Sequence, residues 1–87
     1  MQIKAHRKFT NTYQKRIASD PKLVSKFQTK LKQFLNDPTG PTLKDHKLIG
    51  RLGSYRAFSI TGDIRVVYRI VGDELWLYDI GTHNQVY

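Results

Sequence analysis

The sequence has no cysteine, which excludes disulfide bonds and any metal site built from thiolates. It has no apolar run near the roughly 20 residues that span a bilayer, and its first residues, MQIKAHRKFT, lack the apolar stretch of a signal peptide. It also lacks a glycine-rich loop of the kind that holds nucleotide phosphates. We therefore expect a cytoplasmic protein of one domain, residues 1–87, with no membrane partner.

Acidic residues are scarce as well. Seven aspartates and glutamates oppose 15 lysines and arginines, for a net charge of +8, and residues 1–36 hold nine of the basic residues and one acid. Lys22, Lys26 and Lys30 recur at intervals of four, so a helix would align them on one face with no glutamate to offset their repulsion. Such a surface attracts nucleic acid or an acidic protein segment, and the missing acidic neighbours favour contact with phosphates.

The N-terminal half predicts a short strand at residues 1–5 and then two helices. Aromatic or aliphatic residues recur at every fourth position within residues 7–19, the pattern of an amphipathic helix. Asp20 suits an N-cap and Pro21 suits the first helical position, so a second helix should cover residues 21–35 before NDPTGP ends it. We expect the two helices to be antiparallel and packed through their aromatic residues.

After residue 50 the pattern changes to strands. Residues 54–60, 64–71 and 74–80 are rich in β-branched and aromatic residues, and tight-turn sequences, TGD and GD, separate them. The predicted fold is therefore α+β: a short strand, a two-helix antiparallel hairpin and a three-stranded antiparallel meander. Helices should cover one face of the sheet and leave the other open.

Alternation along the middle strand assigns its two faces. The even-numbered residues from Ile64 to Ile70 are aliphatic or aromatic, so we expect them to pack on the helices. Arg65 and Arg69 alternate with them and should place two guanidinium groups on the open face.

Two histidines near the ends of the meander are candidates for acid–base chemistry. His46 precedes the first strand and His83 follows the last, so both should lie at the end of the sheet where Asp63 and Arg65 begin the middle strand and Tyr87 ends the chain. Two imidazoles and an arginine suffice for metal-free cleavage of RNA. One base takes the ribose 2′-OH proton, one acid protonates the leaving 5′ oxygen, and a cation stabilises the phosphorane.

A metal site is the competing use of His46, Asp63 and His83, because two histidines and a carboxylate can hold zinc. No helical HxxxH spacing supports it, and the nearby arginines would repel a cation. We expect no metal and no other cofactor.

Over essentially its whole length the chain resembles the RelE/ParE superfamily of toxins from bacterial type II toxin–antitoxin systems, and in particular its YafQ-like mRNA interferases. The resemblance rests on DHKLIGRLGSYRAFSI, GDIRVVYRI and DIGTHNQVY. It implies a compact fold like that of microbial ribonucleases, cleavage of mRNA in the ribosomal A site, and inhibition by an antitoxin encoded beside the toxin. We expect that antitoxin to be acidic, and the ribosome and mRNA to be the other partners.

The resemblance also implies roles for five residues. His83 would be a principal acid–base residue with His46 as its partner, and Asp63 would assist proton transfer or orient a partner. Arg65 would stabilise phosphate charge. Tyr87 would stack on or position a nucleotide.

Five basic residues are expected to bind RNA or the ribosome. One matches a position where superfamily members often carry a basic residue, one lies on the predicted open face, and three form the cationic helix face. They are Arg56, Arg69, Lys22, Lys26 and Lys30.

The chain departs from the YafQ-like pattern at three positions. Ser59 stands where another active-site histidine can occur, Ile64 replaces a tryptophan, and Asp79 replaces an arginine that precedes Gly-Thr-His. Asp79 could pair with Arg65 or Arg69.

Two alternatives to the nuclease remain open. A gyrase-poisoning toxin shares the fold and needs no acid–base pair, so the two histidines count against it. A catalytically weakened member that only binds RNA or antitoxin fits the three departures.

Overall fold

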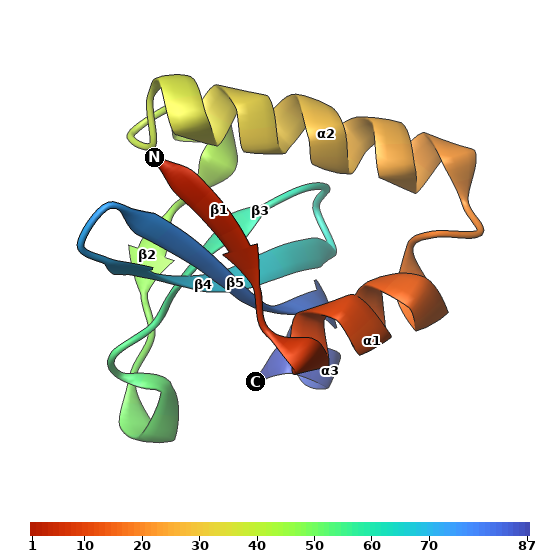
Figure 1. Cartoon of the computed structure of the whole chain (residues 1–87). Helices are drawn as coiled ribbons and strands as arrows, with labels where there is room; N and C mark the ends of the chain where they lie inside the picture. Colours follow the sequence, from red (N-terminus) through yellow and green to blue (C-terminus); the bar gives the residue numbers. More distant parts are fainter.

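The computed structural model describes residues 1–87 as a five-stranded sheet with three helices (Figure 1). The strand order is β1-β5-β4-β3-β2; β1 runs parallel to β5, and every other neighbouring pair is antiparallel. This confirms the predicted α+β fold and adds β2 and α3 to it. The elements are β1 (Gln2–Ala5), α1 (Arg7–Arg16), α2 (Pro21–Asn36), β2 (His46–Lys47), β3 (Arg56–Ser59), β4 (Ile64–Val71), β5 (Glu74–Thr82) and α3 (His83–Val86).

Side-chain caps fix where the two long helices begin. The His6 ring accepts a hydrogen bond from the backbone N–H of Lys8 at the start of α1. The Asp20 carboxylate accepts from the first backbone N–H groups of α2, and Pro21 occupies the first turn, as predicted. α1 ends at Arg16, three residues before the predicted end. None of the helices combines the length and the apolar character that a membrane crossing requires.

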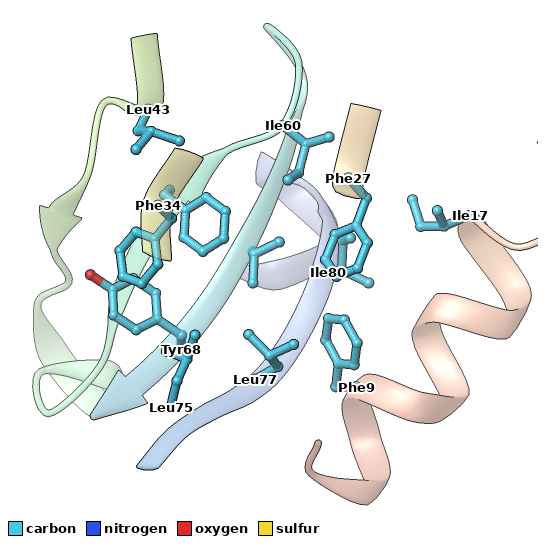
Figure 2. Close-up of a cluster of buried hydrophobic side chains, with 12 residues drawn as sticks. Phe9, Ile17, Phe27, Phe34, Leu43, Ile60, Tyr68, Leu75, Leu77 and Ile80 are labelled. Atoms are coloured by element: carbon cyan, nitrogen blue, oxygen red, sulfur yellow. The ribbon is translucent and has the colours of Figure 1, made fainter. Parts of the chain in front are cut away.

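Aromatic rings dominate the main core, which fills the space between the helices and one face of the sheet (Figure 2). Phe34 of α2 stacks on Phe58 of β3 with ring centroids 4.6 Å apart, and it meets the edge of Tyr68 at 4.8 Å. The two helices also meet through aromatic residues, because Phe27 lies 5.3–5.9 Å from rings on α1. The buried residues of this core are Phe9, Ile17, Phe27, Phe34, Leu43, Phe58, Ile60, Val66, Tyr68, Leu75, Leu77 and Ile80.

The second face of the sheet is partly covered, so the prediction of an open face is wrong. The loop between β2 and β3 and the C-terminal helix α3 fold over it, on the side opposite α2 (Figure 1). Their apolar side chains bury Val67 completely, although it shares a face with the arginines of β4. We call this group the second-face cluster; its buried members are Leu48, Ala57, Val67 and Val86.

A β-bulge in β5 changes which of its side chains face the main core. Val67 pairs with Asp79 and Tyr68 pairs with Leu77, which leaves Tyr78 as the extra residue. Ile80 therefore returns to the main core three residues after Leu77. At the far end of β4, Ile70 is 46% exposed, so its predicted packing against the helices is wrong.

Removing the central aromatic ring should reveal how much of the stability lies in this core. Phe34→Ala is expected to lower the free energy of unfolding by about 3–5 kcal/mol, because it leaves a cavity against Phe58 and Tyr68. Leu35→Ala on the same helix is the matched control: Leu35 is 43% exposed, so its loss should cost under about 1 kcal/mol. Chemical denaturation measures both values, and equal losses would contradict this description of the core.

Candidate functional site

The last residues form a helical turn rather than a frayed tail. Thr82 is the N-cap of α3, and its backbone N–H donates a 2.8 Å hydrogen bond to the Gln85 side chain in a capping box. Val86 is buried in the second-face cluster and anchors the turn to the sheet. His83 and Tyr87, at either end of the turn, remain exposed at the rim.

Gly81 makes the close packing behind this turn possible. A Cβ atom at this position would lie 2.6 Å from Arg16 Nη1 and 2.6 Å from Gln85 Oε1. Arg16 cannot easily move away, since Nη1 donates a 2.8 Å hydrogen bond to the Ile80 carbonyl and lies 3.4 Å from Asp79. Close packing therefore requires the glycine of the Gly-Thr-His sequence, independently of any chemistry at His83.

Asp79 is fully buried and is held by α1, not by β4. Its carboxylate lies 3.4 Å from Arg16 and 3.5 Å from the Lys8 ammonium, and it accepts a hydrogen bond from the next backbone N–H. The expected pairing with Arg65 or Arg69 is therefore wrong. The bulge places the carboxylate beneath α1, so it does not neutralise either arginine of β4.

Four of the five predicted catalytic residues converge around the ring of Tyr87. The His46 Nε2 lies 3.4 Å from the Tyr87 hydroxyl, and the His83 ring stands edge-on to the Tyr87 ring at 4.5 Å between centroids. The Arg65 guanidinium lies over the same ring at 5.9 Å. Partial burial raises the pKa of Tyr87 above its usual range, while the Arg65 charge opposes the rise.

The tautomer of His46 follows from its other neighbour. Its Nδ1 lies 3.0 Å from the Lys44 carbonyl, which can only accept a hydrogen bond. In the neutral ring Nδ1 therefore carries the proton, and Nε2 can accept a hydrogen bond from the Tyr87 hydroxyl. His46, His83 and Tyr87 together line a hollow of about 490 Å³, which we call the rim hollow.

Asp63 lies at the same end of the sheet but does not join this group. It precedes Ile64, which pairs with Thr82 beside His83. Its side chain is exposed and makes no hydrogen bond or ion pair, and only its backbone N–H is held, by the Thr61 hydroxyl at 3.1 Å.

Sequence reasoning missed a polar cluster at Asp45, the residue just before His46. Asp45 accepts hydrogen bonds from Arg56 at 3.1–3.2 Å and from the Tyr68 hydroxyl at 2.6 Å. The hydrogen bond to Asp45 raises the pKa of Arg56, and burial raises that of Tyr68. Tyr68 could have predicted this cluster from the sequence, because a tyrosine in a core needs a hydrogen-bond partner for its hydroxyl. In Figure 2 this hydroxyl points away from the other rings.

The predicted RNA- or ribosome-binding residues lie outside the rim hollow. Arg56 is already paired with Asp45, and Arg69 lies 5.9 Å over the Tyr55 ring. The three lysines of α2 make no ion pair and follow that helix separately from the histidines. No three histidine, aspartate or glutamate side chains are grouped closely enough to hold a metal ion.

Comparison with known proteins identifies the class. The model of a family described as "Bacterial toxin of type II toxin-antitoxin system, YafQ" matches residues 1–87. The chain therefore belongs to the YafQ family of toxins from type II toxin–antitoxin systems, as its resemblance predicted. No curated protein sequence matches it.

Several solved structures share the fold. YafQ from E. coli strain BL21(DE3) is 22% identical, with a TM-score of 0.79 over 99% of this chain and 97% of that one. The E. coli DinJ–YafQ complex contains a chain 25% identical, with a TM-score of 0.71 over 99% and 97%. A copper-bound mutant toxin from Helicobacter pylori is 24% identical, with a TM-score of 0.79 over 100% and 99%.

A methyl group at Gly81 should disturb the support of α3. Gly81→Ala is expected to lower the free energy of unfolding by about 1–3 kcal/mol, because Arg16 and Gln85 must both move. Gly62→Ala is the matched control, since a Cβ there meets nothing within 4 Å. Thermal and chemical denaturation measure both, and equal stability of the two variants would refute the close approach.

Tyr68 should make the fold sensitive to alkali. Because burial raises its pKa above the ordinary value of 10.0, the folded state keeps a proton that the unfolded state loses above pH 10. Stability should thus be intact below pH 10 and fall as the pH rises further, by at most about 1.4 kcal/mol per pH unit from this residue. Tyr68→Phe should flatten the fall measured by denaturant titration; an identical slope in both proteins would contradict this.

Proposed function

We propose that this toxin is an endoribonuclease that cleaves mRNA bound to the ribosome. The convergence of two imidazoles and a guanidinium around Tyr87 is the observation that carries the proposal. Both histidines are exposed, so a phosphodiester can reach them. Membership of the YafQ family supports the role of a toxin, and the geometry of the two histidines and Arg65 supports acid–base chemistry on RNA.

The chemistry needs one proton acceptor and one proton donor. Nε2 of neutral His46 carries no proton, so it is suited to take the proton of the ribose 2′-OH as the 2′ oxygen bonds to phosphorus. The bond from phosphorus to the 5′ oxygen breaks, and protonated His83 gives its proton to that oxygen. The products are a 2′,3′-cyclic phosphate and a 5′-hydroxyl end.

Three further residues complete the proposed site. Arg65 neutralises the charge that develops on the phosphorane, and Asp79 does not compete for it, because α1 holds that carboxylate. Tyr87 positions the nucleotide between the two histidines. Asp63, which is exposed beside Ile64, orients a hydrogen-bond donor of the substrate.

An antitoxin and ribosomal RNA are the proposed partners. An antitoxin accompanies YafQ in the DinJ–YafQ toxin–antitoxin complex of E. coli, and a chain of net charge +8 suits an acidic antitoxin. Lys22, Lys26 and Lys30 of α2 are proposed to bind ribosomal RNA. A gyrase poison would make no use of the histidine pair, so the geometry favours the nuclease.

Removing either histidine should abolish most of the cleavage. His46→Ala and His83→Ala are each expected to slow cleavage of ribosome-bound mRNA by about 10²–10⁴-fold, because each removes one proton-transfer group. Asn84→Ala, an exposed neighbour on α3, is the matched control and should keep the native rate. Single-turnover cleavage of a programmed ribosome measures all three, and native rates in both histidine variants would overturn the mechanism.

Reversing the charge of the α2 lysines should weaken ribosome binding without unfolding the protein. The Lys22→Glu, Lys26→Glu, Lys30→Glu variant is expected to bind ribosomes more weakly and with a shallower dependence on salt, since fewer counterions are released. Lys32→Glu, at an exposed lysine of α2 outside this row, is the control. Sedimentation with ribosomes over a salt series measures this, and unchanged affinity of the triple variant would refute the lysine contact.

A further inference from the structure

The rim hollow continues as a groove across the second face of the sheet. It shares Arg51, Leu52 and Tyr87 with a middle hollow of about 460 Å³. The middle hollow in turn shares Tyr55 and Tyr78 with a distal hollow of about 360 Å³. The three hollows therefore form one groove that starts at the histidines and ends beyond the Tyr55–Tyr78 pair.

Aromatic rings line the distal end of this groove. Tyr55 and Tyr78 have ring centroids 4.7 Å apart, and His6 lies 5.0 Å from Tyr78 on its other side. Trp76, the only tryptophan of the chain, lines the same hollow, and its indole N–H donates a 3.0 Å hydrogen bond to Glu74. Tyr55 and Tyr78 pack on the second-face cluster, yet they and Trp76 are only half-buried, so part of each ring is accessible from the distal hollow.

Two cations lie over these rings. The Arg69 guanidinium lies over Tyr55 at 5.9 Å, and the Lys8 ammonium lies over Tyr78 at 5.0 Å. Arg51 lines the stretch between them and the rim. Glu74 is the only acid that lines any of the three hollows, and it is engaged by the indole of Trp76.

Planar rings paired with cations match the two parts of a nucleotide, a base to stack and a phosphate to neutralise. An acidic peptide would use the cations and leave the ring faces without a matching group. Arg65 and Arg69 are four residues apart on β4, about 13 Å along the strand, so a single nucleotide at the rim does not reach the distal rings. The ligand that fits is a chain of nucleotides.

We propose that the distal hollow is a base-stacking subsite, in which Tyr55, Trp76 and Arg69 hold a nucleotide of single-stranded RNA away from the scissile bond. The proposal rests on the proposed function for the position of the scissile bond at the rim. The subsite itself requires only binding, so it can be tested without cleavage.

Trp76 supplies a direct signal of occupancy. A short 2′-O-methyl RNA oligonucleotide, which lacks the attacking 2′-OH, is titrated into the full chain at low salt while tryptophan fluorescence is followed. Saturable quenching is expected. Tyr55→Ala should weaken binding by about 5- to 150-fold through the lost stacking, and Arg69→Gln should weaken it and reduce its salt dependence. Tyr55→Phe keeps the ring and should keep the affinity; Lys32→Gln, outside the groove, is the charge control.

Each outcome decides the proposal. Weaker binding in Tyr55→Ala and Arg69→Gln, with native affinity in Tyr55→Phe and Lys32→Gln, supports the subsite. No quenching at saturating oligonucleotide, or equal affinity in all variants, overturns it. Because the oligonucleotide cannot be cut, RNA binding without any mRNA cleavage on ribosomes would refute the proposed function and leave the subsite standing.

Discussion

A buried carboxylate ties the first helix to the last strand, next to the turn that carries His83 and Tyr87. Asp79 is inaccessible to water and is paired with Arg16 and Lys8. Breaking a buried pair by removing one partner typically costs about 3–5 kcal/mol, because the other charge stays buried. Arg16 also packs on Gly81 and binds the adjacent carbonyl, so the same interaction fixes where α3 begins.

The two faces of the sheet have different roles, one in stability and the other in holding the site. On one face the aromatic main core supplies the burial that a chain of 87 residues without disulfides requires. On the other face the smaller second-face cluster buries Val86 and so holds the turn that carries His83 and Tyr87. Hydrogen bonds from Arg56 and Tyr68 hold Asp45, the residue next to His46. Both histidines are thus exposed side chains on firmly supported backbone.

Local signals in the sequence predicted the long helices and strands, but they did not predict the contacts that hold the site in place. Asp20 and Pro21 fixed the start of α2, and strand alternation placed Arg65 correctly, because caps and periodicity act over a few residues. The bulge at Tyr78 and the burial of Asp79 depend on how β5 meets both β4 and α1, which no local pattern records. The order of the meander predicted the convergence at the rim, but it could not show that Asp63 makes no contact there.

The most direct test of the account is to map mRNA ends in cells after induced expression of the native chain and of the His46→Ala, His83→Ala double variant. The account predicts growth arrest with mRNA cut at codon-phased positions by the native chain, and neither effect with a folded double variant. Growth arrest by the double variant with intact mRNA would contradict it, because toxicity would then not require the acid–base pair.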